Sequence, residues 1–274
     1  MKLTTFTAGA TLIALAAGPL QAQNDCAAGK TLNDGVLTIA TGNPAYFPWV
    51  IDDAPESGQG FEAAVAYAVA NAMGFENPQV EWVRSSFDQA IQPGAKNFDF
   101  NLQQYSITPE REQVIDFSDP YYSAAAAVLS KQSVAEAGAT NSVGSLKGLV
   151  WGAAAGTTAP GMIQSRIGPE KSMLLYDDTA DVVAAMQAGQ IDAALFDLPT
   201  ALYLAAVEMD DGTILGQFPP EMSEDPDQFG LLMEDGNPLK ECVNAALAEI
   251  SADGTLAAIE AEWLQQTTGV PVIE

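Results

Sequence analysis

The chain has 274 residues and is strongly acidic, with 36 aspartates and glutamates against 10 lysines and arginines and no histidine. Such a charge repels nucleic acid and anionic membranes, so we expect neither as a partner. The lack of histidine and of a CxxC pair argues against a zinc site and a histidine-assisted nucleophile, and we expect no metal and no cofactor. We attribute the acidity to solubility or adaptation to salt, because surface charge alone does not imply a cationic ligand.

The first residues predict a secretory signal peptide over residues 1–22. Lys2 precedes an apolar core over residues 8–17, which is too short to span a bilayer, and Gly18-Pro19 breaks it. The alternative is a buried N-terminal helix, and the polar residues that follow argue against it. We therefore expect a protein exported to the periplasm. We expect no lipid anchor, because the residues before Cys26 are not the small apolar residues of a lipoprotein signal.

Two cysteines, Cys26 and Cys242, lie near opposite ends of the chain. In an oxidising compartment they favour a disulfide, and two free thiols are the alternative. A disulfide would close a long loop and stabilise the fold by about 2–4 kcal/mol. It would also bring the two ends of the mature chain side by side.

The first part of the mature chain alternates predicted strands and helices. Residues 36–41 form a β-rich run, and after a loop held by two prolines a helix follows over 61–73, where apolar residues recur every four positions. A strand over 80–83 comes next. A short helix then starts at Ser86, where the S-x-x-Q spacing of a capping box occurs, and a strand over 98–102 follows. This order predicts a parallel sheet covered by helices.

The same order recurs in the second half of the chain. Strands over 149–153, 173–176 and 191–196 alternate with a helix that begins near Pro160 and a helix over 179–187. Polar residues follow the strands in both halves. Open α/β sheets bind ligands at the carboxyl ends of their strands, so we expect the site there.

A last strand over 228–233 and two helices over 239–251 and 255–265 complete the sequence. We expect two Rossmann-like α/β lobes, and the chain would cross between them twice. The first lobe would contain residues 23–123 and 218–274, and the second lobe residues 124–217. Two crossing segments form a hinge, and lobes joined in this way close on a ligand.

Several short motifs occur in the order and spacing of a known family. They are YFPW at 46–49, GFE at 60–62, SITPER at 106–111, DFSDPY at 116–121, GTT at 156–158 and IDAA at 191–194. Together they resemble the family 3 extracytoplasmic solute-binding proteins over about residues 30–265. The resemblance implies the type II periplasmic binding protein fold, in which two lobes close like a Venus flytrap, and the binding of a polar amino acid for an ABC importer.

The resemblance also implies contacts to the ligand main chain. Arg111 would hold the α-carboxylate with its planar fork, and Thr157 and Thr158 would donate hydroxyl and N–H groups to the same carboxylate. Asp197 would pair with the α-ammonium, and Ser106 would bond a main-chain group from the first lobe. The alternatives are a surface salt bridge for Arg111, helix capping for the threonines and a strand-end turn for Asp197.

Four more residues complete the implied site. Tyr46 and Phe87 would sandwich the ligand side chain. Asn43 stands where some relatives carry an aspartate that holds a basic side chain, which weakens an expectation of lysine or arginine specificity. Gln104 stands where many relatives have a small residue, so its amide would reach into the cleft or shrink it. Whether the buried amide of Asn101 contacts ligand or protein is left open.

We therefore expect a monomer that binds a polar amino acid, or a similar small solute, and delivers it to the membrane permease of an ABC importer. The alternatives are a periplasmic enzyme of lyase type on the same scaffold and a ligand-sensing module. We expect no catalytic residues, because the cleft motifs contain no second well-placed acid or base beside Asp197. A sensor would need a membrane span or a signalling domain. The sequence does not reveal which amino acid is bound.

Overall fold

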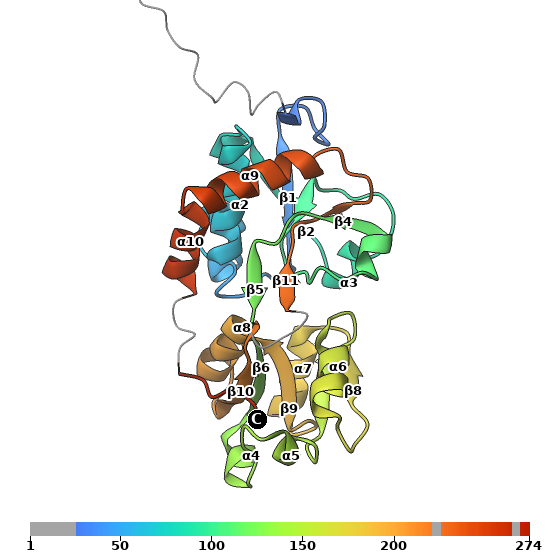
Figure 1. Cartoon of the computed structure of the whole chain (residues 1–274), viewed down its shortest axis with the longest axis vertical. Helices are drawn as coiled ribbons and strands as arrows, with labels where there is room; N and C mark the ends of the chain where they lie inside the picture. The colour runs from blue at the N-terminus through green and yellow to red at the C-terminus, as the bar shows by residue number, and fades with distance from the viewer. Residues whose placement is uncertain (1–25, 221–225, 265–268) are drawn as a thin grey trace, which may run out of the picture.

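The computed structural model describes residues 26–220, 226–264 and 269–274, so the predicted signal peptide lies outside the described residues. The described chain forms two α/β lobes, one above the other in Figure 1, each built on a five-stranded sheet. Segments from both the beginning and the end of the chain build the upper lobe, and the middle of the chain builds most of the lower lobe (Figure 1).

The first lobe has a mixed sheet with the strand order β2-β1-β3-β12-β4. β1 runs parallel to β2 and β3, as the alternating pattern predicts, whereas β12 runs antiparallel to β3 and β4. The strands are β1 (Leu37–Thr41), β2 (Val80–Arg84), β3 (Phe100–Asn101), β4 (Ile115–Phe117) and β12 (Leu232–Glu234). The helices are α2 (Phe61–Ala72), α3 (Phe87–Ala90), α9 (Lys240–Ala252) and α10 (Thr255–Trp263), with single turns η1 (Ile51–Asp53), η2 (Pro55–Ser57), η3 (Asn77–Gln79) and η4 (Arg111–Gln113).

Local sequence signals explain the first-lobe helices. α2 buries Phe61, Val65 and Val69 completely, so its four-residue repeat faces the core as predicted. The Ser86 hydroxyl accepts a hydrogen bond from the Gln89 N–H and caps α3, which is only one turn long.

The second lobe has a mixed sheet with the strand order β10-β6-β9-β7-β8. β7, β8 and β9 are mutually parallel and correspond to the predicted strands, whereas β6 and β10 run antiparallel and were not predicted. The strands are β6 (Ala126–Lys131), β7 (Trp151–Ala154), β8 (Leu174–Tyr176), β9 (Ala193–Asp197) and β10 (Gly212–Phe218). The helices are α4 (Gln132–Glu136), α5 (Val143–Leu146), α6 (Ala159–Met162), α7 (Thr179–Gln187) and α8 (Leu198–Tyr203), with π-helical extensions η5 (Ile163–Ile167) and η6 (Leu204–Glu208).

Two short antiparallel strands, β5 (Tyr122–Ala124) and β11 (Asp227–Phe229), pair with each other between the lobes (Figure 1). The Trp49 indole packs edge-on against the rings of Tyr122 and Phe229, at 5.8 and 5.9 Å between centroids. Its Nε1–H donates to the Thr200 hydroxyl of the second lobe at 2.8 Å. The hinge therefore has a fully buried aromatic support on the first-lobe side.

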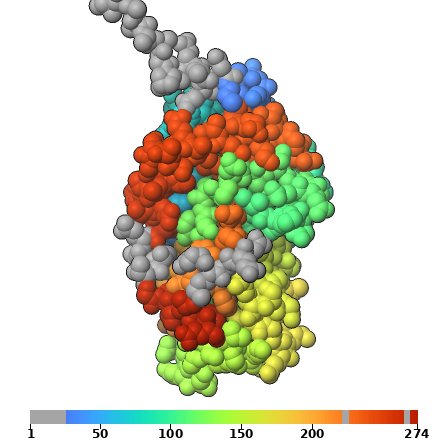
Figure 2. All heavy atoms as spheres, viewed as in Figure 1, coloured from blue at the N-terminus to red at the C-terminus, as the bar shows by residue number. Residues whose placement is uncertain are grey.

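The last residues of the chain differ from the division that the sequence suggests. That division assigns residues 218–274 to the first lobe, whereas the C-terminal segment lies on the lower lobe (Figures 1 and 2). The Ile273 N–H donates to the Gln217 carbonyl at 2.9 Å, and the Val143 N–H donates to the Glu274 carbonyl at 2.8 Å. Ile273 fills an apolar cluster of the second lobe, which explains why the tail crosses over.

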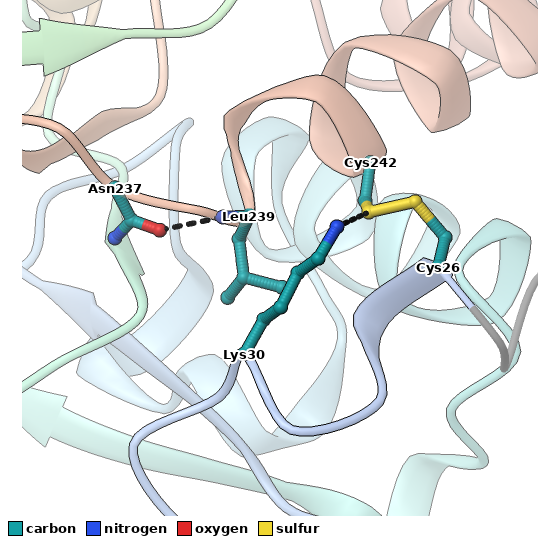
Figure 3. Close-up of a disulfide and its surroundings, with 5 residues drawn as sticks. All are labelled: Cys26, Lys30, Asn237, Leu239 and Cys242. Atoms are coloured by element: carbon teal, nitrogen blue, oxygen red, sulfur yellow. Dashed lines mark hydrogen bonds between the residues drawn. A yellow bond between two sulfur atoms is a disulfide. The ribbon is translucent and has the colours of Figure 1, made fainter.

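The predicted disulfide between Cys26 and Cys242 is confirmed (Figure 3). It joins the first described residue to α9, with a Cα–Cα distance of 5.9 Å across a separation of 216 residues. The Lys30 ammonium lies against the Cys242 sulfur at 3.5 Å, beside Leu239 (Figure 3). The bridge therefore ties the start of the first lobe to its C-terminal helices.

No single helix within the described ranges is long and apolar enough to cross a membrane. α9 and α10 meet that test only as a pair, across a bend of 75°.

Replacing both cysteines with serine, Cys26→Ser with Cys242→Ser, should lower the free energy of unfolding by about 2–4 kcal/mol, because the unfolded chain loses a long closed loop. Urea denaturation followed by circular dichroism measures this loss. The wild-type protein in excess reductant is the control and should show the same shift. Unchanged midpoints in both samples would show that the bridge does not stabilise the fold.

Candidate functional site

A cavity of about 180 Å³ lies between the two lobes. Its walls come from the segments that follow β1, β2 and β3 in the first lobe and β7, β8 and β9 in the second lobe. These strands are parallel within each lobe, so their carboxyl ends share one edge, where α/β sheets bind ligands. The two sheets thus present their binding edges to each other across one cavity.

The sequence-predicted site residues gather at this cavity, with one exception. Those that line it are Asn43, Tyr46, Phe87, Gln104, Ser106, Thr157, Thr158 and Asp197. The exception is Arg111, which does not line the cavity, although its guanidinium carbon lies 5.4 Å from the centroid of the Phe87 ring in the wall. The buried amide of Asn101 does not line the cavity either.

Arg111 joins the two lobes. Its Nη1 donates to the Ser106 carbonyl of the first lobe at 2.7 Å, and its Nη2 donates to the Gly156 carbonyl of the second lobe at 2.9 Å. These bonds use two of the five guanidinium N–H groups, so others stay available to a carboxylate. The alternative, a salt bridge to a neighbouring glutamate, is not among the described contacts of this side chain. Burial lowers the pKa of Arg111, and the Asp227 carboxylate opposes that shift.

Three hydroxyl groups lie where the lobes meet. The Ser106 and Thr158 hydroxyls are 3.4 Å apart, one from each lobe, and Thr158 Oγ1 also donates to Asp227 Oδ2 at 3.4 Å. Thr157 Oγ1 instead donates to the Ala154 carbonyl at 2.8 Å, so its hydroxyl holds the loop before α6. The carboxylate-binding role of both threonines stays a prediction.

Asp197 ends β9 and caps α8. Its Oδ1 accepts a hydrogen bond from the Thr200 N–H at 2.8 Å, so the alternative role as a turn residue is present. Burial raises the pKa of Asp197 from 3.8 to about 6, with a further contribution from the Asp227 carboxylate and opposition from the Thr200 bonds. A ligand ammonium beside Asp197 would offset that unfavourable burial of charge.

The two predicted aromatic residues lie in different surroundings. The Phe87 ring packs against Tyr105 at 4.8 Å between centroids and also faces Arg111. Tyr46 is half-buried, and its pKa is raised by burial first and then by nearby carboxylates, of which Asp178 contributes most. Tyr46 therefore places an aromatic face beside a negative charge from the second lobe.

Sequence reasoning missed most of the acidic residues of the site. Five aspartates line the cavity: Asp88, Asp177, Asp178, Asp197 and Asp227. Asp197 and Asp227 are half-buried, and the other three are exposed at its rim. Asp177 and Asp178 directly follow a predicted strand, as Asp197 does, so the strand-end rule could have found them. Asp227 follows no predicted strand, and no local signal marks it.

Gln104 lines the cavity in the left-handed region, with a φ of 50°. Its backbone N–H donates to Glu62 Oε1 at 2.8 Å, and its Nε2 donates to Glu62 Oε2 at 2.5 Å. The Tyr121 hydroxyl donates to Glu62 Oε1 as well. Burial raises the pKa of Glu62 from 4.5 to about 7, although these three hydrogen bonds lower it. Glu62 belongs to the GFE motif at 60–62, whose sequence alone indicates no role for this carboxylate.

Comparison with known proteins places this geometry among binding proteins. Residues 37–266 match the bacterial extracellular solute-binding proteins, family 3. The chain is 29% identical over 214 residues to the ABC transporter arginine-binding protein 1 of Escherichia coli strain K12, covering 76% of this chain and 82% of that protein. It is 30% identical over 224 residues to the histidine-binding periplasmic protein of Salmonella typhimurium strain LT2, covering 78% and 82%.

A solved structure of an amino acid-binding protein has a similar fold. The ancestral amino acid-binding protein AncCDT-1, a precursor of cyclohexadienyl dehydratase, superposes with a TM-score of 0.66 at 26% identity, covering 84% of this chain and 95% of that chain. The matched range contains every motif that carried the resemblance. The predicted fold, two α/β lobes joined by two strands, is confirmed.

The free energy of unfolding should fall as the pH rises from about 4 to about 7. Glu62 and Asp197 have pKa values of about 7 and about 6 in the folded protein, against 4.5 and 3.8 ordinarily. Folding therefore favours the protonated forms of both groups. The stability that they contribute is complete at a pH below their ordinary pKa values and is lost once the pH exceeds their pKa values in the folded protein. We expect a fall on the order of 5 kcal/mol, roughly half of it from each carboxyl group.

Urea denaturation at a series of pH values measures this slope. The double variant Glu62→Gln with Asp197→Asn should show a much flatter profile across the same range. The slope that remains reports the general self-repulsion of an acidic chain. Equal slopes in the wild type and the double variant would contradict the assignment.

Proposed function

The chain belongs to the bacterial extracellular solute-binding proteins of family 3, and on this premise we propose that it binds an amino acid between its lobes for delivery to the membrane permease of an ABC importer. The observation that carries the proposal is the interlobe cavity at the strand ends, with Arg111 beside it and Asp197 in its wall. One guanidinium and one half-buried carboxylate match the two charges of an amino-acid main chain.

In the proposed complex, the ligand α-carboxylate lies between Arg111 and the loop of Thr157 and Thr158. The α-ammonium lies against Asp197, whose raised pKa falls when a cation approaches. Asp227 lies within reach of Thr158 and adds negative charge on the hinge side. Both lobes would thus contact the same small molecule.

We infer further that the ligand has a basic side chain. With five aspartates in the cavity wall, a cationic ligand lowers the electrostatic repulsion that a neutral one leaves in place. Tyr46 beside Asp178 offers an aromatic face and a carboxylate to a guanidinium or ammonium group. Asp178 then takes the role that Asn43 cannot perform. Arginine-binding and histidine-binding relatives support this choice.

Contacts across the cleft support closure on the ligand. Arg111 bonds to Gly156 and the Ser106 hydroxyl meets Thr158, while the Phe47 ring packs at a tilt against the Tyr203 ring at 4.9 Å between centroids. A ligand held by both lobes binds the closed form better than the open form, which shifts the population toward closure. We propose that the permease recognises this closed form of an exported, periplasmic monomer.

An enzyme on this scaffold is the second candidate, favoured by the solved relative that is a precursor of a dehydratase. Asp197 could act as a general acid because its pKa is raised to about 6. Prolonged incubation with L-arginine followed by mass spectrometry separates the two functions. A binding protein returns the ligand unchanged, and a product peak would support the enzyme.

A thermal-shift screen against the common amino acids should give a rise in melting temperature with at least one of them. Arg111→Ala should lower the affinity for that ligand by about 100-fold or more, because two charge-assisted hydrogen bonds are lost. Arg166→Ala is the matched control, since Arg166 does not line the cavity, and it should bind normally. Full binding by Arg111→Ala would show that another group anchors the carboxylate.

L-arginine should bind at least about 10-fold more tightly than L-citrulline, which has nearly the same shape without the charge. Asp178→Asn should reduce that preference about three- to tenfold while keeping the cap of α7, because asparagine is a good capping residue. Asp210→Asn, a substitution at an exposed site outside the cavity, is the control. Isothermal titration calorimetry provides the constants, and equal affinity for the two ligands would refute a basic-ligand site.

A further inference from the structure

We infer that Glu62 is a positioning residue that fixes the orientation of the Gln104 amide, so that Gln104 presents a hydrogen-bond acceptor to a ligand N–H group. The inference deepens the proposed function, because the ligand group is identified only if an amino acid occupies the cavity. The geometry of the Glu62–Gln104 pair stands without that assumption.

The carboxylate of Glu62 is completely enclosed at the start of α2, with a side chain in the protein interior and 1% of the residue exposed. Three donors converge on it: the Gln104 backbone N–H, the Gln104 Nε2 group and the Tyr121 hydroxyl. Buried carboxylates are rare and need such partners. The cluster therefore links a helix start, the cavity wall and the residue before hinge strand β5.

The chemistry of a carboxylate decides which way the amide points. An ionised carboxylate only accepts hydrogen bonds, so the Gln104 amide can face Glu62 only with its NH₂ group. The carbonyl Oε1 of Gln104 is then left for the cavity, and no described residue donates to it. A glutamine without such a neighbour could present either end of its amide.

The contact with Glu62 also stabilises the backbone conformation of Gln104. A φ of 50° is unfavourable for a residue with a side chain, and the Glu62 carboxylate holds the N–H of that residue at 2.8 Å. Both the position of the turn and the rotation of the amide thus depend on one side chain. A ligand donor, such as an ammonium or a guanidinium, is the group that an exposed carbonyl oxygen accepts.

The pH dependence of ligand affinity tests the positioning role of Glu62, because a purely structural role would not make the affinity follow the titration of this carboxylate. The titratable groups facing it are Tyr121, Tyr105 and Asp197, and the Gln104 amide is its other neighbour. A protonated Glu62 can donate to Gln104 Oε1, which releases the fixed orientation. Affinity for a ligand donor should therefore rise as the pH increases through about 7, and Glu62→Gln should remove that part of the profile.

Isothermal titration calorimetry with L-arginine at pH 8 tests whether Glu62 affects ligand binding through Gln104. We expect Gln104→Leu to weaken binding about 10- to 30-fold and Glu62→Gln about 3- to 10-fold. The double variant should bind like Gln104→Leu within about twofold, because Glu62 acts through Gln104. Asp99→Asn, which changes another buried carboxylate of this lobe that holds two backbone N–H groups, should leave the affinity unchanged. If the affinity losses of the two single variants multiply in the double variant, the inference is overturned.

Nuclear magnetic resonance of the ligand-free protein separates this inference from the proposed function. In the wild type, one side-chain amide proton of Gln104 should be shifted downfield and exchange slowly with water, because it is bonded to a buried carboxylate. Glu62→Gln should abolish that signature. Unchanged Gln104 amide signals in the variant would overturn the inference. The signature together with no binding of any amino acid would refute the proposed function and leave the Glu62–Gln104 pairing established.

Discussion

The Arg111 guanidinium is the charged group that connects the two lobes beside the cavity. It donates to the Ser106 carbonyl on one side of the cleft and to the Gly156 carbonyl on the other. A half-buried cation needs acceptors, and each lobe supplies one backbone carbonyl. The same requirement explains why the proposed α-carboxylate site is at this position. A ligand carboxylate would add a full negative charge to a guanidinium that backbone dipoles only partly satisfy, so we expect ligand binding to be coupled to lobe closure.

Around that cation, carboxylates lie at two depths of the cavity wall. Asp88, Asp177 and Asp178 are exposed at the rim, where solvent weakens their interactions but leaves them able to attract a cation. Asp197 is half-buried and Glu62 lies behind the wall, and burial raises the pKa of both. The ionised forms of these two buried carboxyl groups are unfavourable without a partner and become favourable beside a cation or a hydrogen-bond donor. We therefore expect the site to select its ligand by charge and hydrogen-bond donors as well as by shape.

Much of this site could be predicted because family motifs mark its residues. The resemblance implied Tyr46, Phe87, Thr157 and Asp197, each of which also follows a predicted strand, and the structure brings all four to the cavity wall. Asp227 and Glu62 could not be found in that way. Asp227 returns from a distant part of the chain to the hinge, and the partners of Glu62 lie 42 and 59 residues away. Strand β6 was missed because an alanine-rich run has low strand propensity and is held in place only by its neighbours. The C-terminal tail gave no local signal that Ile273 belongs to the core of the other lobe.

A crystal structure of the protein with L-arginine would show directly how the ligand lies between the lobes. We expect closed lobes, with the ligand carboxylate between Arg111 and the loop of Thr157 and Thr158, and the α-ammonium against Asp197. A ligand bound in the cavity with its carboxylate turned away from Arg111, or lobes that stay apart around it, would refute the proposed binding mode.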